Sequence, residues 1–292
     1  MNKIIDISIV IVSWNVKNLL HRCLDSILAN QNDLNLEIIV IDNASTDGTQ
    51  QMLQKLPITN YQLPITVITN QTNNGFAAAN NQGIKIAKGK YILLLNPDTE
   101  IRQNTLHEMY KFFEKHSDAG VAGCKHLNPN RTLQPSVRRF PTFWSQFLIL
   151  HKLHHLLPNL KTFRHYFAKD FDYEKTQPCD QIQGSFFMIN RPCLKKVGLF
   201  DEKFFIWFEE VDYCKRAYNA GFKTYYNANA SIIHHGAQSF NQVLPLDKQK
   251  IFNKSLLYYF KKHHSWFEYI SMYRAHFNSL IFAWLKSLFI KK

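Results

Sequence analysis

The first 125 residues alternate short apolar runs with stretches in which apolar residues recur at helical spacing. The apolar runs predict strands at 7–14, 37–42, 65–70, 91–95 and 119–123. Helical spacing predicts helices between them at 16–30, 46–56, 76–89 and 103–116. Continuous apolar strands separated by helices are typical of a mostly parallel sheet that helices cover on both faces. We therefore predict an α/β fold.

The pattern changes after residue 130. Apolar residues recur over 143–160 with Lys and His between them, and later segments predict strands at 182–190, 222–227 and 230–236, a short helix at 209–220 and further helix from about 247. We divide the chain into a domain at 1–242, with a basic, aromatic insert at 131–175, and a C-terminal amphipathic helical segment at 243–292.

The positive charge is concentrated in two segments. The chain carries a net charge of +13. Residues 131–175 hold eight Lys or Arg against three acids, and residues 243–292 hold nine against two, which leaves only +1 for the rest. A nearly neutral body with two basic, aromatic-rich segments indicates an anionic surface partner, either lipid headgroups or nucleic acid.

The C-terminal segment has the composition of a helix that lies on a membrane. Its longest clean apolar run, LIFAWL, is far shorter than the roughly 18 residues that a membrane span needs. An amphipathic helix with Trp, Phe and flanking Lys suits the plane of a membrane interface. The alternative is a helix whose apolar face packs on the protein core.

Cysteine usage and the N-terminus indicate a cytosolic protein. The five cysteines show no C-x-x-C spacing, so we expect reduced thiols rather than a disulfide framework or a zinc site. The N-terminal apolar run is interrupted by Asp6 and is followed by no small-residue cleavage site, so we interpret it as a first strand and not as a signal peptide.

Polar residues follow three of the predicted strands, at Ser13-Trp14-Asn15, Asp42-Asn43 and Asn96-Pro97-Asp98. Ligands of such sheets bind beyond the carboxyl ends of the strands. Asp98 offers the carboxylate oxygen that Mg²⁺ or Mn²⁺ prefers, and Asn96 offers a neutral oxygen on the same side. The alternative is a turn, because Pro-Asp is common in turns. Asp42 either caps the turn into the next helix or binds a base or ribose.

A second group of acids follows the aromatic-rich stretch 204–208: Glu209, Glu210 and Asp212. Acids at a helix start complement the positive end of its dipole, which is one explanation. The other is a general base, because neighbouring aromatic rings and like charges raise the pKa of a carboxyl group. His234, which follows a strand, is either a metal ligand or an ordinary histidine. The stretch NNGFAAANN (73–81) lacks the glycine pattern of dinucleotide or P-loop sites.

Taken in order, these segments resemble family 2 glycosyltransferases of the GT-A fold, particularly the bacterial rhamnosyltransferase-like branch. The resemblance covers about residues 7–240. It rests on VIVSWN (10–15), VIDNASTDGT (40–49), NNGFAAANNQGI (73–84), LLLNPD (93–98), GSFFMINR (184–191), FDEKFFIWFEEVDYCKR (200–216) and HHG (234–236).

The resemblance implies inverting transfer of a sugar from a nucleoside-diphosphate sugar. The residues at nucleotide-binding positions are Ser13, Asn15, Asp42, Asn74 and Asn96. Asp98 and His234 match ligands of a Mg²⁺ or Mn²⁺ ion, and Glu210 matches the catalytic base, with Glu209 and Asp212 beside it. Two positions depart from the pattern. Asn96 replaces the first Asp of the D-x-D metal motif, and Glu210 stands where Asp is usual.

The branch implies transfer of rhamnose from dTDP-L-rhamnose to a polyprenyl-diphosphate-linked glycan such as an O-antigen or capsule. The expected location is the cytoplasmic side of the inner membrane, on its anionic surface. One alternative is transfer of galactofuranose, galactose or N-acetylhexosamine from a UDP-sugar, and another is a non-catalytic sugar-nucleotide binder. A nucleic-acid-binding protein would leave the strand-end acids unexplained.

Overall fold

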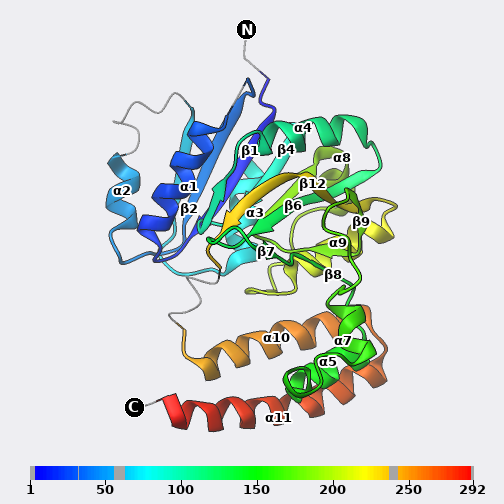
Figure 1. Ribbon diagram of the computed structural model, residues 1–292. Coiled ribbons are helices and arrows are strands. Elements are labelled where there is room, and N and C mark those ends of the chain that lie inside the picture. Colours follow the sequence, from blue (N-terminus) through cyan, green and yellow to red (C-terminus); the bar gives the residue numbers. More distant parts are fainter. Residues whose placement is uncertain (1–3, 32, 56–62, 237–242, 291–292) are drawn as a thin grey trace.

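A computed structural model describes residues 4–31, 33–55, 63–236 and 243–290. Its main sheet has the strand order β3-β2-β1-β4-β11-β6-β12-β5 (Figure 1). The strands of this path are β1 (Ile7–Ser13), β2 (Leu36–Asp42), β3 (Ile65–Thr69), β4 (Tyr91–Leu95), β5 (Thr99–Ile101), β6 (Ala119–Leu127), β11 (Phe186–Asn190) and β12 (Lys223–His234). Short strands β7 (Leu133–Gln134) and β9 (Gln177–Cys179) pair with β6 and β12, and β8 (Val137–Arg138) pairs with β10 (Gln181–Ile182).

The strand directions confirm the predicted mostly parallel α/β sheet. β3, β2, β1 and β4 are parallel, as are β6 and β12, whereas β11 runs antiparallel between β4 and β6. The two strands predicted at 222–227 and 230–236 are one strand, β12, whose pairing with β6 shifts register between Asn227 and Ser231. The predicted strand at 182–190 is confirmed only as β11 and the end of β10. β5 was not predicted because three residues carry too little periodicity.

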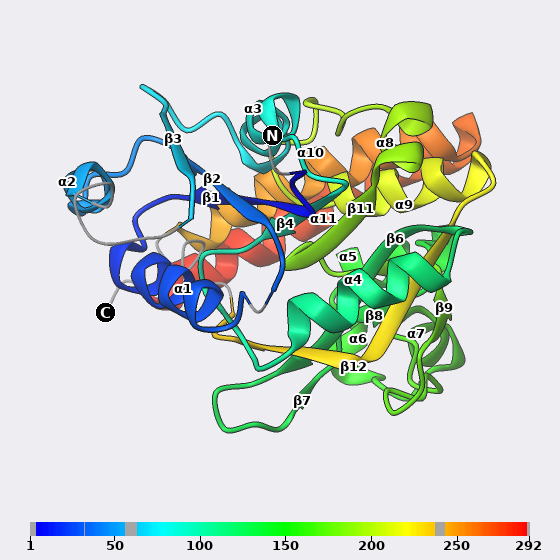
Figure 2. The same cartoon turned by 90° about the horizontal axis from the view of Figure 1, so that it is seen from above.

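Helices cover both faces of the sheet (Figure 2). They are α1 (Lys17–Ala29), α2 (Thr49–Lys55), α3 (Phe76–Ile86), α4 (Thr105–Lys115), α8 (Arg191–Val197) and α9 (Glu209–Asn219). Side chains of α1, α2 and α4 pack with Ile7, Ile9 and Ile11 of β1, and side chains of α3, α8 and α9 pack on the other face with Val10. The alternation of side chains along β1 therefore builds two cores, one on each face.

A separate helical layer lies below the carboxyl ends of the parallel strands (Figure 1). It consists of α5 (Phe143–Leu150), α6 (Leu153–Leu156), α7 (Lys161–Tyr166), α10 (Pro245–His263) and α11 (Trp266–Ile290). A third apolar cluster joins it to the segment before α9, through Phe204 and Phe208 on one side and Leu256, Tyr259 and Met272 on the other. The predicted boundary at residue 242 falls in 237–242, which lie outside the described residues.

Ion pairs join α10 to α9. The fully buried carboxylate of Asp212 lies 2.7 Å from His263 Nε2, 2.8 Å from Lys262 Nζ and 2.7 Å from Arg216 Nε. Lys262 also pairs with Asp201 at 2.9 Å. Burial alone would raise the pKa of Asp212, but the hydrogen bond from His263 and the charge of Arg216 hold it at about 2. Asp212 therefore fastens the C-terminal helices to the sheet domain.

We expect Asp212→Asn to lower the free energy of unfolding by about 3 kcal/mol at pH 7, because Arg216 and Lys262 lose a buried counter-charge and His263 loses a charged partner. Since the folded-state pKa is depressed, this contribution is present above the unfolded-state value and is lost as the pH falls towards about 2. Urea denaturation at pH 7 measures the difference. Asp247→Asn is the control, because its pair with Lys250 is exposed and contributes less than about 1 kcal/mol. Equal losses in the two variants would contradict the role of Asp212.

Candidate active site

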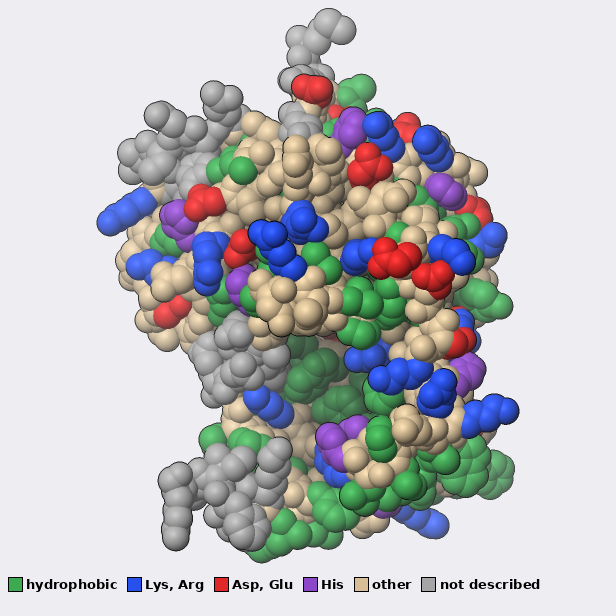
Figure 3. Space-filling model, in the orientation of Figure 1, with side chains coloured by type: hydrophobic (Ala, Val, Ile, Leu, Met, Phe, Trp, Pro, Cys, Tyr) green, Lys and Arg blue, Asp and Glu red, His purple; other side chains and the backbone are tan. Residues whose placement is uncertain are grey.

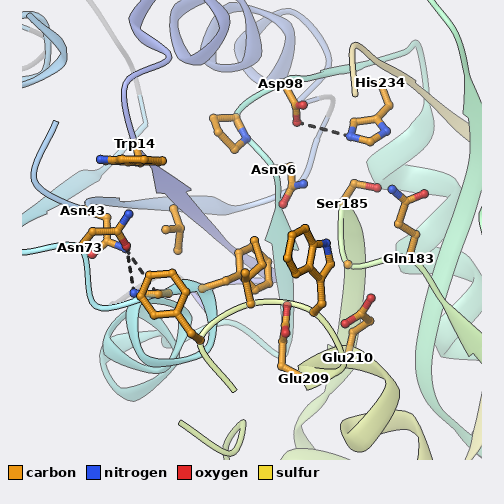
Figure 4. A pocket seen from close by; sticks show the side chains of 18 residues that line it. Trp14, Asn43, Asn73, Asn96, Asp98, Gln183, Ser185, Glu209, Glu210 and His234 are labelled. Carbon is orange, nitrogen blue, oxygen red and sulfur yellow. Dashed lines mark hydrogen bonds and ion pairs between the residues drawn. The ribbon is translucent and has the colours of Figure 1, made fainter. Parts of the chain in front are cut away.

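A cavity opens at the carboxyl ends of the parallel strands and extends to the start of α9 (Figure 4). Five of the predicted site residues line it: Asn96, Asp98, Glu209, Glu210 and His234. They come from the end of β4, the first turn of α9 and the end of β12, so residues more than a hundred positions apart meet in one site. Asp98 and His234 lie at one end of the view in Figure 4, and the two glutamates lie opposite them.

Four predicted nucleotide-binding residues lie just outside the lining: Ser13, Asn15, Asp42 and Asn74. Their chain neighbours Trp14, Asn43 and Asn73 line the cavity instead. The reason is local geometry, because successive side chains in extended backbone point in opposite directions. The side chains of these loops that line the cavity are therefore one position away from the predicted residues.

Two of the predicted residues that do not line the cavity, Asp42 and Asn15, hold the loops beside it through hydrogen bonds. Asp42 is fully buried, and its Oδ2 accepts a hydrogen bond of 2.9 Å from Gln50 Nε2. Its Oδ1 is also buried and makes no hydrogen bond within the described part of the chain. Asn15 holds a left-handed backbone (φ +53°), and its Oδ1 accepts a hydrogen bond from the backbone N–H of Thr46. Asp42 and Asn15 thus fix the two loops between which a nucleotide would lie.

Hydrogen-bonded asparagine side chains form the side of the cavity that lies away from Asp98 and His234 (Figure 4). Asn43 Nδ2 donates to Asn73 Oδ1 at 2.8 Å, and Asn43 Oδ1 accepts from the backbone of Asn74 at 3.1 Å. Gly75 follows with a φ of +83°, which favours glycine. A Cβ there would lie 2.4 Å from the carbonyl oxygen of Phe205, and that oxygen accepts a 2.6 Å hydrogen bond from the backbone of Phe76. The close approach ties the two sides of the cavity together.

Antiparallel pairing of β5 with β12 brings His234 beside Asp98. His234 lies opposite Thr99 in the register, and its Nε2 is 3.4 Å from Asp98 Oδ1. Gln134 lies 2.6 Å from the other ring nitrogen through its Oε1, while its Nε2 donates to Asn128 Oδ1. Because Oε1 only accepts, Nδ1 of His234 donates the hydrogen bond to Gln134, and Nε2 is the ring nitrogen that faces Asp98.

This pair fits the donor set of a Mg²⁺ or Mn²⁺ site. Nε2 of His234 and Oδ1 of Asn96 are both buried without a hydrogen bond among the described residues. No group of three His, Cys, Asp or Glu in the described segments is arranged to hold a metal. Asp98 and His234 would therefore supply two ligands, and substrate phosphates or water would complete the coordination shell.

Sequence reasoning missed a second histidine behind His234. The rings of His126 and His234 are 5.8 Å apart, and His126 is buried with its Nδ1 3.4 Å from Ser185 Oγ. Burial, followed by the charge of His234, lowers the pKa of His126 to about 3. His126 is therefore neutral at physiological pH. It lies in a nine-residue strand, and no spacing signal connects it with His234.

The two glutamates of α9 are held in a desolvated position. The preceding Trp207 and Phe208 both have left-handed backbones (φ +66° and +68°), a conformation that costs energy in non-glycine residues. Burial raises the pKa of both carboxyl groups, and the charge of Glu210 raises that of Glu209 further, whereas the charge of Arg138 opposes the shift of Glu210. Oε2 of each glutamate is buried without a hydrogen bond among the described residues. Such groups suit proton transfer.

Asp212, the third predicted acid, does not line the cavity. Its carboxylate is occupied by Arg216, Lys262 and His263, as described above. Asp212 lies two positions after Glu210 and therefore on a different side of the helix from it, where α10 supplies Lys262 and His263. Two of the three adjacent acids therefore face the cavity, and the third holds their helix in place.

Comparison with known proteins identifies the family. Residues 8–198 match the family model described as glycosyl transferase family 2. The chain belongs to this family. The glycosyltransferase is 25% identical over 220 residues to the N-acetylglucosaminyl-diphospho-decaprenol L-rhamnosyltransferase of Mycobacterium tuberculosis (strain ATCC 25618 / H37Rv), an alignment that covers 70% of this chain and 68% of the relative. It is 28% identical over 225 residues to the low-salt glycan biosynthesis hexosyltransferase Agl10 of Haloferax volcanii, covering 73% of this chain and 61% of that one.

Solved structures confirm the GT-A fold of the glycosyltransferase. GalNAc-T7, crystallised with UDP, GalNAc and Mn²⁺, matches with a TM-score of 0.61 and 18% identity over 79% of this chain and 43% of its own. Residues 1–349 of S. aureus TarS in complex with UDP-GlcNAc match with a TM-score of 0.55 and 17% identity over 86% of this chain and 65% of that chain.

We expect Glu210→Gln to reduce sugar transfer by about 10²- to 10⁴-fold with nucleotide binding retained, because an amide cannot accept the proton. In the wild type, the raised pKa of Glu210 makes the rate increase with pH through that pKa, since the base acts only when ionised. Steady-state rates across pH, with nucleotide affinity from calorimetry, measure both effects.

Glu209→Gln is the matched control. Burial and the charge of Glu210 raise the pKa of Glu209 well above its ordinary value, which favours the neutral carboxyl group that an amide imitates. We expect this variant to keep most of its activity. A loss as large as that of Glu210→Gln would transfer the role of base to Glu209.

Proposed function

We propose that this glycosyltransferase moves L-rhamnose from dTDP-L-rhamnose, with inversion, to a hydroxyl of a polyprenyl-diphosphate-linked cell-surface glycan such as an O-antigen or capsule. One observation carries the proposal: a desolvated base, Glu210, lies in the same cavity as the Asp98–His234 pair. The choice of sugar and acceptor rests on the similarity to the mycobacterial L-rhamnosyltransferase. Transfer from a UDP-sugar is the second candidate, because TarS was crystallised with UDP-GlcNAc.

The nucleotide would lie between the loops after β1, β2 and β3. Trp14 offers an aromatic face for a base. The Asn73 oxygen accepts hydrogen bonds from Asn43 and Gly75, which leaves its Nδ2 to donate to a nucleotide. Asp42 precedes Asn43 in the chain, and its buried Oδ1 makes no hydrogen bond among the described residues. After a small movement of the loop, this oxygen would accept a hydrogen bond from a base or ribose. With the base in this position, the diphosphate of the nucleotide would extend towards Asp98.

Asp98 and His234 would hold the divalent cation, which supplies charge neutralisation for the departing diphosphate when bound. Gln134 keeps His234 in the tautomer with a free Nε2. Asn96 adds a neutral oxygen to the same wall of the cavity.

Glu210 would take the proton from the acceptor hydroxyl as that oxygen attacks the anomeric carbon. The new carbon–oxygen bond forms while the bond from the anomeric carbon to the diphosphate oxygen breaks on the opposite face, so the configuration inverts without a covalent enzyme intermediate. The proton ends on Glu210 and the electron pair leaves with the nucleoside diphosphate. Phe205, Ile206 and Trp207 cover the site and keep water away from the reacting carbon.

A panel of dTDP-, UDP- and GDP-sugars tests the donor. With Mg²⁺ or Mn²⁺ present, we expect dTDP-L-rhamnose to be consumed fastest, with release of dTDP and an inverted anomeric centre detected by NMR. A chelator should abolish turnover, and Asp98→Asn should need a higher metal concentration because one ligand loses its charge. Preference for a UDP-sugar would select the second candidate. Failure to consume any donor would instead support a non-catalytic sugar-nucleotide binder.

We also propose that the helical layer binds the inner face of the cytoplasmic membrane, where a lipid-linked acceptor would be located. On α11, Tyr273, Phe277, Ile281 and Trp284 are exposed at helical spacing and form an apolar stripe. Figure 3 shows hydrophobic side chains along the lower edge of the molecule, over this layer. None of the helices in the described part of the chain combines the length and apolar character needed to span a bilayer. Such a stripe suits a helix that lies in the membrane interface.

Flotation with phosphatidylglycerol-containing vesicles tests this membrane contact. We expect the double variant Phe277→Ser, Trp284→Ser to float markedly less than the wild type, because both side chains are half exposed and would lose apolar contact with lipid. The double variant Ile4→Ser, Ile86→Ser removes exposed apolar groups away from the helical layer and is the control. Equal flotation of the three proteins would contradict the proposal.

A further inference from the structure

A second cavity adjoins the active site at Glu210. It shares Gln183, Trp207 and Glu210 with the first cavity. The rest of its lining comes from the segment around β8, from α7 and from α10, through residues such as Arg138, Tyr166 and Phe252. These elements border the hollow between the body of the molecule and the helical layer in Figure 3. The proposed base therefore faces two compartments, only one of which contains the Asp98–His234 pair.

The second cavity has the composition of a small-molecule site. Aromatic rings form much of its wall, and the ring of Phe252 lies 5.9 Å from that of Trp207 and 5.6 Å from that of Phe208. Ser136 also lines it and is 5% exposed, and its hydroxyl oxygen is buried without a hydrogen bond among the described residues. Apolar walls with a few unsatisfied polar groups are typical of ligand sites.

Arg138 gives this cavity a positive charge. Its guanidinium lies 5.1 Å above the ring of Phe167, and the side chain makes no hydrogen bond or ion pair with the residues that the structure describes. The next residue, Arg139, points to the other face of β8 and pairs with Asp170 at 3.3 Å. Arg138 acts on Glu210 through its charge but makes no hydrogen bond or close ion pair among the described residues, so its guanidinium N–H groups can bind an anionic ligand such as a phosphate.

We propose that this second cavity is the acceptor subsite, in which a sugar lies against the aromatic rings and presents a hydroxyl to Glu210 while Arg138 binds a phosphate attached to the same sugar. The inference rests on the proposed function, because it assumes that Glu210 deprotonates an acceptor. It explains why Glu210 lines both cavities: the acceptor oxygen would lie where the two cavities meet, within reach of the carboxylate and facing the donor's anomeric carbon in the first cavity.

Arg138→Gln tests the subsite, with Arg139→Gln as the matched control. The probes are a short-chain N-acetylglucosaminyl-diphospho-lipid and the neutral octyl N-acetylglucosaminide. Titration calorimetry on the full chain with dTDP bound measures both affinities. We expect the wild type to bind the phosphorylated probe more tightly than the neutral one. Arg138→Gln should lose about 10- to 100-fold of affinity for the phosphorylated probe only, and Arg139→Gln should match the wild type.

Three results would overturn the proposal. The first is a wild type that binds the phosphorylated probe no more tightly than the neutral one. The second is an equal effect of both arginine variants. The third is an Arg138→Gln variant in which only the pH profile of donor hydrolysis moves, since Arg138 would then act on Glu210 alone. Unchanged dTDP affinity and melting temperature establish that each variant is folded.

Donor hydrolysis separates this inference from the proposed function. Water can replace the acceptor in hydrolysis of the nucleotide sugar, so the wild-type rate of hydrolysis tests the proposed function without an acceptor in the second cavity. A wild type that hydrolyses no donor would contradict the proposed function, whereas the calorimetric comparison would still decide whether the second cavity binds a phosphorylated sugar.

Discussion

The active site depends on keeping two neighbouring carboxyl groups out of water at the start of α9. Burial of Glu209 and Glu210 is unfavourable, and the aromatic segment before them adds strained backbone at Trp207 and Phe208. The structure offsets this cost by packing Phe204 and Phe208 into the third apolar cluster. Burial raises the pKa of both groups, and the charge of Glu210 raises that of Glu209 further, so the arrangement favours one protonated and one ionised carboxyl group.

The C-terminal helices therefore contribute to the chemistry without reaching the reacting atoms. They supply half of the apolar cluster, and His263 and Lys262 contact Asp212 and so hold the helix that carries the proposed base, Glu210. Phe252 of α10 also forms part of the second cavity. A contact of the helical layer with a membrane would thus be transmitted to the base and to the proposed acceptor subsite through directly packed elements.

Much of this organisation could be predicted from the sequence, because strand periodicity and strand-end acids are local signals. Asp98, His234 and Glu210 were found in this way and lie in one cavity. The orientation of side chains at strand ends could not be predicted, so Asn73 was missed while its neighbour was chosen. Asp212 was predicted as a site residue because it lies among other acids, but in the structure its carboxylate contacts His263 of α10. Arg138, which lines the second cavity, belongs to no motif that the sequence displays. Such roles arise from contacts distant in sequence.

The contact of Gly75 with Phe205 has a consequence for how the enzyme can diversify. The loop that carries Asn73 and the loop that leads to Glu210 are joined by a hydrogen bond and have no space for a Cβ between them at Gly75. An insertion or a larger residue in either loop therefore displaces the other. New donor preferences in this scaffold should arise by exchange of side chains on unchanged loops, and changes of loop length should be confined to the insert before β9, where the proposed acceptor cavity is built.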